Sequence, residues 1–123
     1  MSGFKRLDFV LSLLLLFSCG KSLPHFEGID ENAFKSDKNG CTMKRYAMRE
    51  SLENQKSLLV GVSEMDIMKL LGRPDRNELY ERNEKFYYYF LLPSPSCQER
   101  RSDSLKLVVR FNALGIAREV YTE

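Results

Sequence analysis

The residues of this chain that could carry chemistry are three cysteines, one histidine and a scattered set of carboxylates. Acid–base or nucleophilic catalysis needs a nucleophile beside a base, or two carboxylates held at a fixed separation. His25 is the only histidine and lies in a segment without helical or strand periodicity, where a solvated imidazole is expected. The chain also lacks the Cys-x-x-Cys spacing of common zinc sites. We therefore predict no catalytic residues, no metal and no cofactor, and expect a protein that is not an enzyme.

Cys19 follows an apolar run, Phe9–Phe17, that comes after a basic start. This order is typical of a signal peptide, and the run is too short to span a bilayer. The segment Leu16–Cys19 resembles the lipobox of bacterial lipoproteins. The resemblance implies that residues 1–18 are removed and that Cys19 carries a diacylglycerol and an N-terminal acyl chain, which together anchor the protein to a membrane. The alternative is ordinary secretory cleavage, which would leave Cys19 as a thiol or a disulfide partner.

The other two cysteines, Cys41 and Cys97, would then lie outside the cytoplasm, where disulfides persist. A bond between them closes a loop of about 56 residues and is worth roughly 4 kcal/mol in the chain-entropy account. Two free thiols are the alternative. We predict the disulfide.

Composition limits the class of protein. The chain has 123 residues, of which 43% are hydrophobic and 29% charged, enough for one globular domain but not for a multidomain enzyme. The formal net charge is only +2. Nucleic acid is not a predicted partner, because phosphate binding needs a clustered positive surface.

The elements of the mature chain are predicted from periodicity and caps. Residues 19–40 lack a period and form a predicted lipidated tether, although Phe26, Ile29 and Phe34 leave open that its later half packs on the domain. The domain is placed at residues 41–123. It begins with a helix over 41–57 that Thr42 could cap, followed by a second helix between Ser63 and Gly72.

Three strands are predicted to follow the helices, over residues 85–92, 104–111 and 116–121. Asn112–Gly115 would form the turn between the last two. The fold class is therefore α+β, with two helices packed on a three-stranded antiparallel meander in a two-layer sandwich.

The first predicted strand is unusually aromatic and permits two interpretations. In the first interpretation, Phe86, Tyr88 and Phe90 fill the core. Tyr87 and Tyr89 then lie flat on the other side of the sheet. In the other, an exposed face docks a partner, since Tyr and Arg are enriched in interface centres. The candidate partner-binding residues of that face are Tyr87, Tyr89, Lys106 and Arg110.

Four motifs in order resemble a known family: Gly61–Ser63, Leu70–Asp75, Phe86–Tyr89 and Leu107–Gly115. They are similar to the SmpA/OmlA domain of BamE-like outer-membrane lipoproteins, over about residues 60–120. The resemblance implies a helix-helix-meander fold on the periplasmic side of the outer membrane. It further implies a non-catalytic scaffold whose partners are subunits of the machine that assembles β-barrel proteins.

The same helix-helix-sheet unit also resembles secreted inhibitors of β-lactamase, whose sheet presents aromatic residues to an enzyme. The alternative function is therefore a periplasmic binding or inhibitory module that docks an enzyme or ligand on its aromatic sheet face. Fold alone does not decide between the two.

Overall fold

The computed structural model describes residues 23–99 and 101–123, so the predicted signal peptide and Cys19 lie outside the described residues. The described part contains four α-helices and one sheet. The helices are α2 (Glu31–Ser36), α3 (Lys44–Ala47), α4 (Arg49–Gln55) and α5 (Glu64–Leu71). The strands are β1 (Arg76–Leu79), β2 (Lys85–Phe90), β3 (Lys106–Phe111) and β4 (Ala117–Thr122). Among these residues, no helix has the length and hydropathy needed to cross a membrane.

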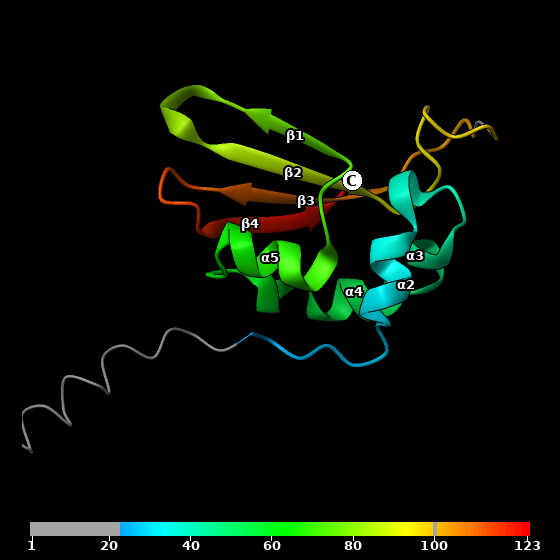
Figure 1. Cartoon of the computed structure of the whole chain (residues 1–123), viewed down its shortest axis with the longest axis horizontal. Helices are drawn as coiled ribbons and strands as arrows, with labels where there is room; N and C mark the ends of the chain where they lie inside the picture. Colours follow the sequence, from blue (N-terminus) through cyan, green and yellow to red (C-terminus); the bar gives the residue numbers. More distant parts are fainter. Residues whose placement is uncertain (1–22, 100) are drawn as a thin grey trace, which may run out of the picture.

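The sheet is antiparallel, and its strands lie in chain order from β1 to β4 (Figure 1). The predicted α+β class is confirmed, but the prediction of three strands is wrong, because β1 forms a fourth strand at the edge. Its sequence, Arg-Asn-Glu-Leu, carries no alternating apolar signal. Pairing with β2, where Arg76 lies opposite Tyr88, holds it in place.

Helix α5 was predicted correctly because its signals are local. The Ser63 hydroxyl accepts a hydrogen bond from the backbone N–H of Asp66 at 3.3 Å, which caps the first turn. Gly72 follows the last turn at φ 82°, a conformation that favours glycine. The apolar stripe faces the core and consists of Ile67, Leu70 and Leu71.

The predicted single helix over residues 41–57 is wrong, since it is divided into α3, α4 and a 3₁₀ turn at Lys56–Leu59. Met43 precedes α3 in the left-handed region, at φ 61°. Thr42 does not cap the helix. Its backbone N–H and its hydroxyl instead donate to Asp37 Oδ1, at 2.7 and 2.6 Å. Asp37 is five positions before Thr42, outside the segment in which a helix cap was predicted.

The segment before residue 41 is part of the domain. Phe26 is 4% exposed and Phe34 is fully buried, and Asp30 caps α2 by accepting from the N–H of Ala33. Burying a phenylalanine is worth about 2 kcal/mol, which holds the segment on the helices. The predicted boundary at residue 41 therefore lies too late, and the packing that the sequence left open begins at Phe26.

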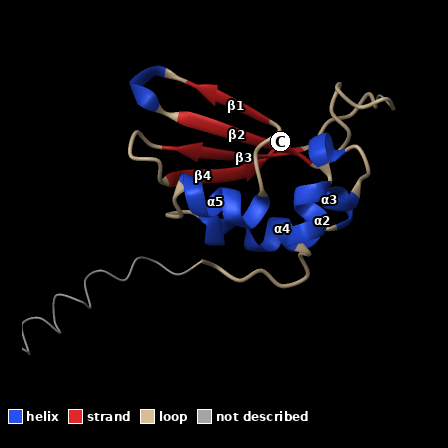
Figure 2. Cartoon of the chain, viewed as in Figure 1, coloured by secondary structure: helices blue, strands red, loops and turns tan. Residues whose placement is uncertain are grey.

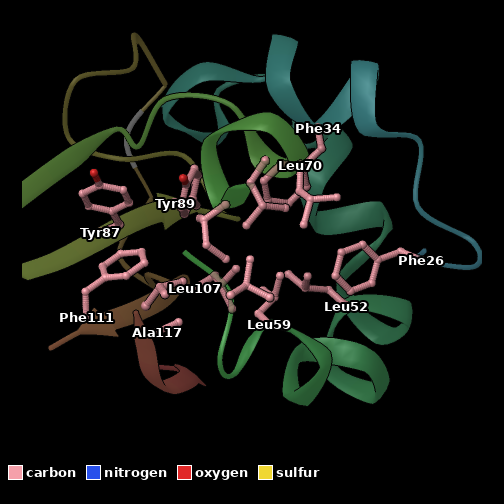
Figure 3. Packing of buried hydrophobic residues seen from close by; sticks show 14 of the residues in the cluster. Phe26, Phe34, Leu52, Leu59, Leu70, Tyr87, Tyr89, Leu107, Phe111 and Ala117 are labelled. Carbon is pink, nitrogen blue, oxygen red and sulfur yellow. The ribbon is translucent and has the colours of Figure 1, made fainter. Parts of the chain in front are cut away.

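The core lies between the sheet and the helices, which gather on one side of the sheet (Figure 2). Figure 3 shows the aromatic and aliphatic side chains of β2 and β3 pointing toward those of the helices. The sheet contributes Tyr87, Tyr89, Leu107, Val109, Phe111 and Ala117. The other layer contributes Phe26, Phe34, Leu52, Leu59, Val62, Ile67, Leu70 and Leu71.

The predicted disulfide between Cys41 and Cys97 is confirmed, with Cα atoms 5.5 Å apart. It joins the segment between α2 and α3 to the segment that links β2 and β3. Gly40, beside it, has φ +68°, and a Cβ there would lie 2.7 Å from the carbonyl oxygen of Phe90. Only glycine allows the two backbones to approach this closely.

A buried arginine ties three parts of the chain together. Arg45 is 1% exposed and its Nη1 lies 2.6 Å from Asp75 Oδ2. Its Nε donates to the carbonyl of Phe34 at 2.8 Å, and its Nη1 to that of Phe90 at 3.1 Å. The guanidinium also lies 4.7 Å from the centre of the Phe34 ring. Arg45 thus fixes the start of β1 and the end of β2 against α2.

Candidate functional site on the open face of the sheet

The side of the sheet away from the helices carries its own set of side chains. Side chains alternate along a strand, and directly paired residues point to the same side. Tyr88 pairs with Val108, and Val108 with Tyr121, so all three share the side opposite the core. We call this side the open face. It comprises Arg76, Glu78, Phe86, Tyr88, Phe90, Lys106, Val108, Arg110, Glu119 and Tyr121.

The structure corrects the predicted set of partner-binding residues. Tyr87 and Tyr89 are 4% and 0% exposed and belong to the core, not to an exposed face. Lys106 and Arg110 do share one side, but it is the side away from both tyrosines. The alternative interpretation is also wrong about the side, since it placed Tyr88 in the core. Three consecutive tyrosines contain no information on which side the helices will cover.

Both buried tyrosines have partners for their hydroxyls. The Tyr89 hydroxyl donates to the carbonyl of Gly72 at 2.9 Å, and that of Tyr87 donates to Glu64 Oε1 at 2.8 Å. Burial and the adjacent Glu64 raise the pKa of Tyr87 to about 12. Both therefore act as structural residues that fasten α5 to β2.

The centre of the open face is aromatic. The rings of Tyr80 and Phe86 meet edge to face at 4.8 Å, and those of Phe86 and Tyr88 are stacked at 6.4 Å. Val108 has no exposed surface, although it lies on the open face between the paired residues Tyr88 and Tyr121. Half-exposed rings over a buried centre are typical of protein-binding surfaces.

Charged pairs form the rim of this aromatic centre. Arg110 Nε donates to Glu119 Oε2 at 2.9 Å, and its Nη1 lies 3.4 Å from Glu84 Oε1. Lys106 Nζ lies 3.4 Å from Glu123 Oε1. Because each cation already has a carboxylate, the face carries no strong field of one sign. Such a surface does not attract a polyanion.

A shallow hollow lies at one corner of the open face, with a volume of about 260 Å³. It is lined by Arg76, Glu78, Tyr80, Tyr88, Phe90, Lys106 and Glu123. The hydroxyls of Tyr80 and Tyr88 both donate to Glu78 Oε2, at 2.9 and 3.0 Å. Burial and this hydrogen bond raise the pKa of Tyr88 above its ordinary value, so its hydroxyl remains a donor even in alkaline solution.

Two cations line the hollow, and Arg76 is the more accessible of them. The Arg76 side chain is 66% exposed, and its nearest carboxylate oxygen is 4.0 Å away on Glu78. Lys106 Nζ lies 5.6 Å from the centre of the Tyr88 ring. An aromatic wall beside two cations suits an acidic or aromatic side chain of another protein.

The described residues offer little for other chemistry. His25 is exposed, and within residues 23–99 and 101–123 no group of three or more His, Cys, Asp or Glu side chains is placed to hold a metal ion. What the open face does provide is aromatic surface and hydrogen-bonding groups. The absence of an enzymatic activity stays a prediction.

Comparison with known proteins adds no relative. No family model matches the chain, and neither a curated protein nor a solved structure matches it. The resemblance to the SmpA/OmlA domain therefore stays a hypothesis that depends on the four motifs.

Proposed function

We propose that this protein is a lipid-anchored, non-catalytic envelope protein that binds another protein through the open face of its sheet. The observation that carries the proposal is the row Arg76, Tyr88, Val108 and Tyr121, which crosses all four strands on the side without helices. A sheet with one solvated side usually has polar residues there. Aromatic residues on that side have no core to fill, so a partner is the function that accounts for them.

The partner is a folded protein with an apolar centre and a carboxylate placed opposite the corner hollow. Tyr88 and Tyr121 supply flat contact area with few rotatable bonds, which lowers the entropy cost of docking. Arg76 supplies the cation for the carboxylate, because its side chain is 66% exposed, whereas Lys106 is paired with Glu123. The paired charges at the other end, around Arg110, fix the register of the complex more than its affinity.

A subunit of the outer-membrane β-barrel assembly machine is the first partner to test. This choice follows from the predicted lipidation at Cys19 and from the four motifs similar to BamE-like lipoproteins. In this role the protein acts as an accessory scaffold on the periplasmic side of the outer membrane. We also propose that this domain packs its helices on its sheet in the same way as BamE-like domains do.

The second candidate is a binding or inhibitory module for a periplasmic enzyme or ligand. The corner hollow favours it, because a concave site of about 260 Å³ accepts a protruding side chain from an enzyme surface. Both candidates use the open face, so the identity of the partner distinguishes them.

Site-specific photocrosslinking in cells tests the proposal. A photoreactive phenylalanine analogue replaces Tyr88 or Tyr121 on the open face, and Met65, which is 71% exposed on α5, serves as the control position. We expect one protein to be crosslinked from both tyrosine positions and not from Met65. A barrel-assembly subunit would support the scaffold, and a periplasmic enzyme would support the second candidate. Equal products from all three positions, or none, would refute docking on the open face.

A matched pair of substitutions separates binding from folding. Tyr88→Ala removes the central ring of the open face, whereas Tyr46→Ala removes a half-buried ring on α3, in the helix layer. We expect Tyr88→Ala to lose at least about 2 kcal/mol of binding, the cost typical of a hot-spot residue. Tyr46→Ala should bind normally. Equal binding by the two variants would show that Tyr88 is not part of the interface.

A further inference from the structure

The N-terminal segment lies on the outer side of the helix layer, away from the sheet. Residues 23–30 run along the helices in Figure 1, and the helices separate them from the strands. The backbone N–H of Glu27 donates to Gln55 Oε1 at 2.8 Å, and Gln55 Nε2 donates to the carbonyl of Glu27 at 2.6 Å. Phe26 enters the core beside α4, in the same buried cluster as Leu52 of that helix (Figure 3).

Very little chain separates this segment from the proposed lipid anchor. Leu23 is four positions after Cys19, and Phe26 is seven positions after it. A fully extended chain covers at most about 3.6 Å per residue. The lipidated residue thus lies within about 14 Å of Leu23 and about 25 Å of Phe26.

The domain is thick compared with that distance. A helix with its side chains is about 10 Å in diameter, and the sheet adds a layer of similar thickness. For the open face to lie on the bilayer, the chain would have to pass around the edge of both layers. The residues after Cys19 are too few for that path.

We infer that the helix layer faces the membrane and that the open face is directed away from it, toward the aqueous compartment. This inference rests on the proposed anchor at Cys19, and it deepens the proposed function by defining the kind of partner. The partner reaches the open face with a water-exposed domain that stands well above the lipid surface. A partner segment embedded in the bilayer does not meet Tyr88 or Tyr121. The lipid therefore sets the position of the domain, and the helix layer acts as a spacer between the bilayer and the open face.

Quenching by lipid headgroups tests this orientation in the lipidated full-length protein. A fluorescent side chain is introduced at Asn54 in the helix layer or at Arg76 on the open face. The protein is reconstituted into phosphatidylethanolamine and phosphatidylglycerol vesicles whose headgroups carry a nitroxide quencher. We expect Asn54 to be quenched several-fold more strongly than Arg76. Equal quenching, or stronger quenching at Arg76, would overturn the inference.

A longer tether provides the matched control. Inserting about twenty Gly and Ser residues after Gly20 adds a flexible chain with a mean span of about 25 Å to the existing tether, which is long enough to free the domain. The difference between the two positions should then disappear. If it persists, the domain itself binds the lipid surface and the short tether does not set the orientation, which refutes the reasoning.

The quenching experiment and the crosslinking experiment can fail independently of each other. The crosslinking experiment identifies a partner whatever the orientation, and the quenching experiment needs no partner. Mass spectrometry of the purified protein reports whether Cys19 carries lipid. An unlipidated Cys19 overturns the inference and the proposed anchor together, but leaves docking on the open face to the crosslinking result.

Discussion

Replacing Arg45 with methionine is expected to destabilise the domain more than any other single arginine substitution in the helix layer. Arg45→Met keeps most of the side-chain volume but removes the guanidinium, which lies 2.6 Å from Asp75 Oδ2. The Asp75 side chain is only 3% exposed. It keeps two backbone donors, the N–H groups of Asn39 and Phe90 at 2.9 and 2.8 Å, but it loses its counter-charge.

The expected loss follows from the partners left behind. Breaking a buried ion pair by removing one member typically costs 3–5 kcal/mol, so we expect about 4 kcal/mol. The carbonyls of Phe34 and Phe90 also lose a donor, which adds to the cost. For a domain of about 100 residues this corresponds to a fall in Tm of roughly 15–30 °C.

Urea unfolding followed by circular dichroism measures this loss, with the disulfide kept intact. The control is Arg49→Met, because Arg49 is exposed, donates to the Tyr46 carbonyl at 2.9 Å and stacks on the Tyr46 ring at 3.9 Å. We expect the control to lose less than about 1 kcal/mol. In the double variant, Asp75→Asn should recover part of the loss caused by Arg45→Met, because it removes the unpaired charge. Similar losses of stability from Arg45→Met and Arg49→Met would refute the assignment of Arg45 as a stabilising buried ion-pair partner.

Three further predictions concern the same part of the domain. Alkylation without reductant should leave Cys41 and Cys97 unlabelled, and replacing both with serine should cost up to about 4 kcal/mol in urea unfolding. Gly40→Ala should cost more than about 1 kcal/mol, because it places a Cβ against the Phe90 carbonyl at a positive φ; wild-type stability in this variant would contradict the close approach. Burial alone would raise the pKa of Asp37, but its hydrogen bonds outweigh this and lower the pKa from 3.8, so its stabilisation is present above pH 4 and lost on acidification. Asp37→Asn should flatten the fall in Tm between about pH 5 and pH 2, and an unchanged profile would contradict the assignment.

The elements that were predicted correctly are those whose causes are local. The helix between Ser63 and Gly72 contains its own cap, apolar stripe and stop. The sequence of β3 comes close to alternation, and a short turn joins it to β4. The disulfide followed from the predicted compartment and the cysteine count. In each case the residues that decide the structure lie within a few positions of one another or need no spatial argument.

The features that were missed depend on contacts between distant residues. Strand β1 is polar and exists because β2 offers it a partner edge. Arg45 resembles any helix-surface arginine in sequence, and its burial depends on groups at positions 34, 75 and 90. Phe26 resembles a tether residue until α4 provides a surface for it. Periodicity within one segment contains no information on any of these partners.

The aromatic side chains of β2 point alternately to the core and to the open face. Those on the open face are the basis for interpreting it as a docking surface. An antiparallel sheet with one solvated side usually alternates apolar and polar residues, and β3 comes close to this pattern. β2 does not, because Tyr87 and Tyr89 fill the core while Phe86 and Tyr88 remain on the open side. Neither residue belongs to the core between the sheet and the helices, although the Tyr88 ring lies beside the buried Val108 on the open face. Aromatic side chains outside that core are a local inconsistency of the kind expected at functional sites. The aromatic residues that mark the docking surface are therefore those that lie outside the core between sheet and helices.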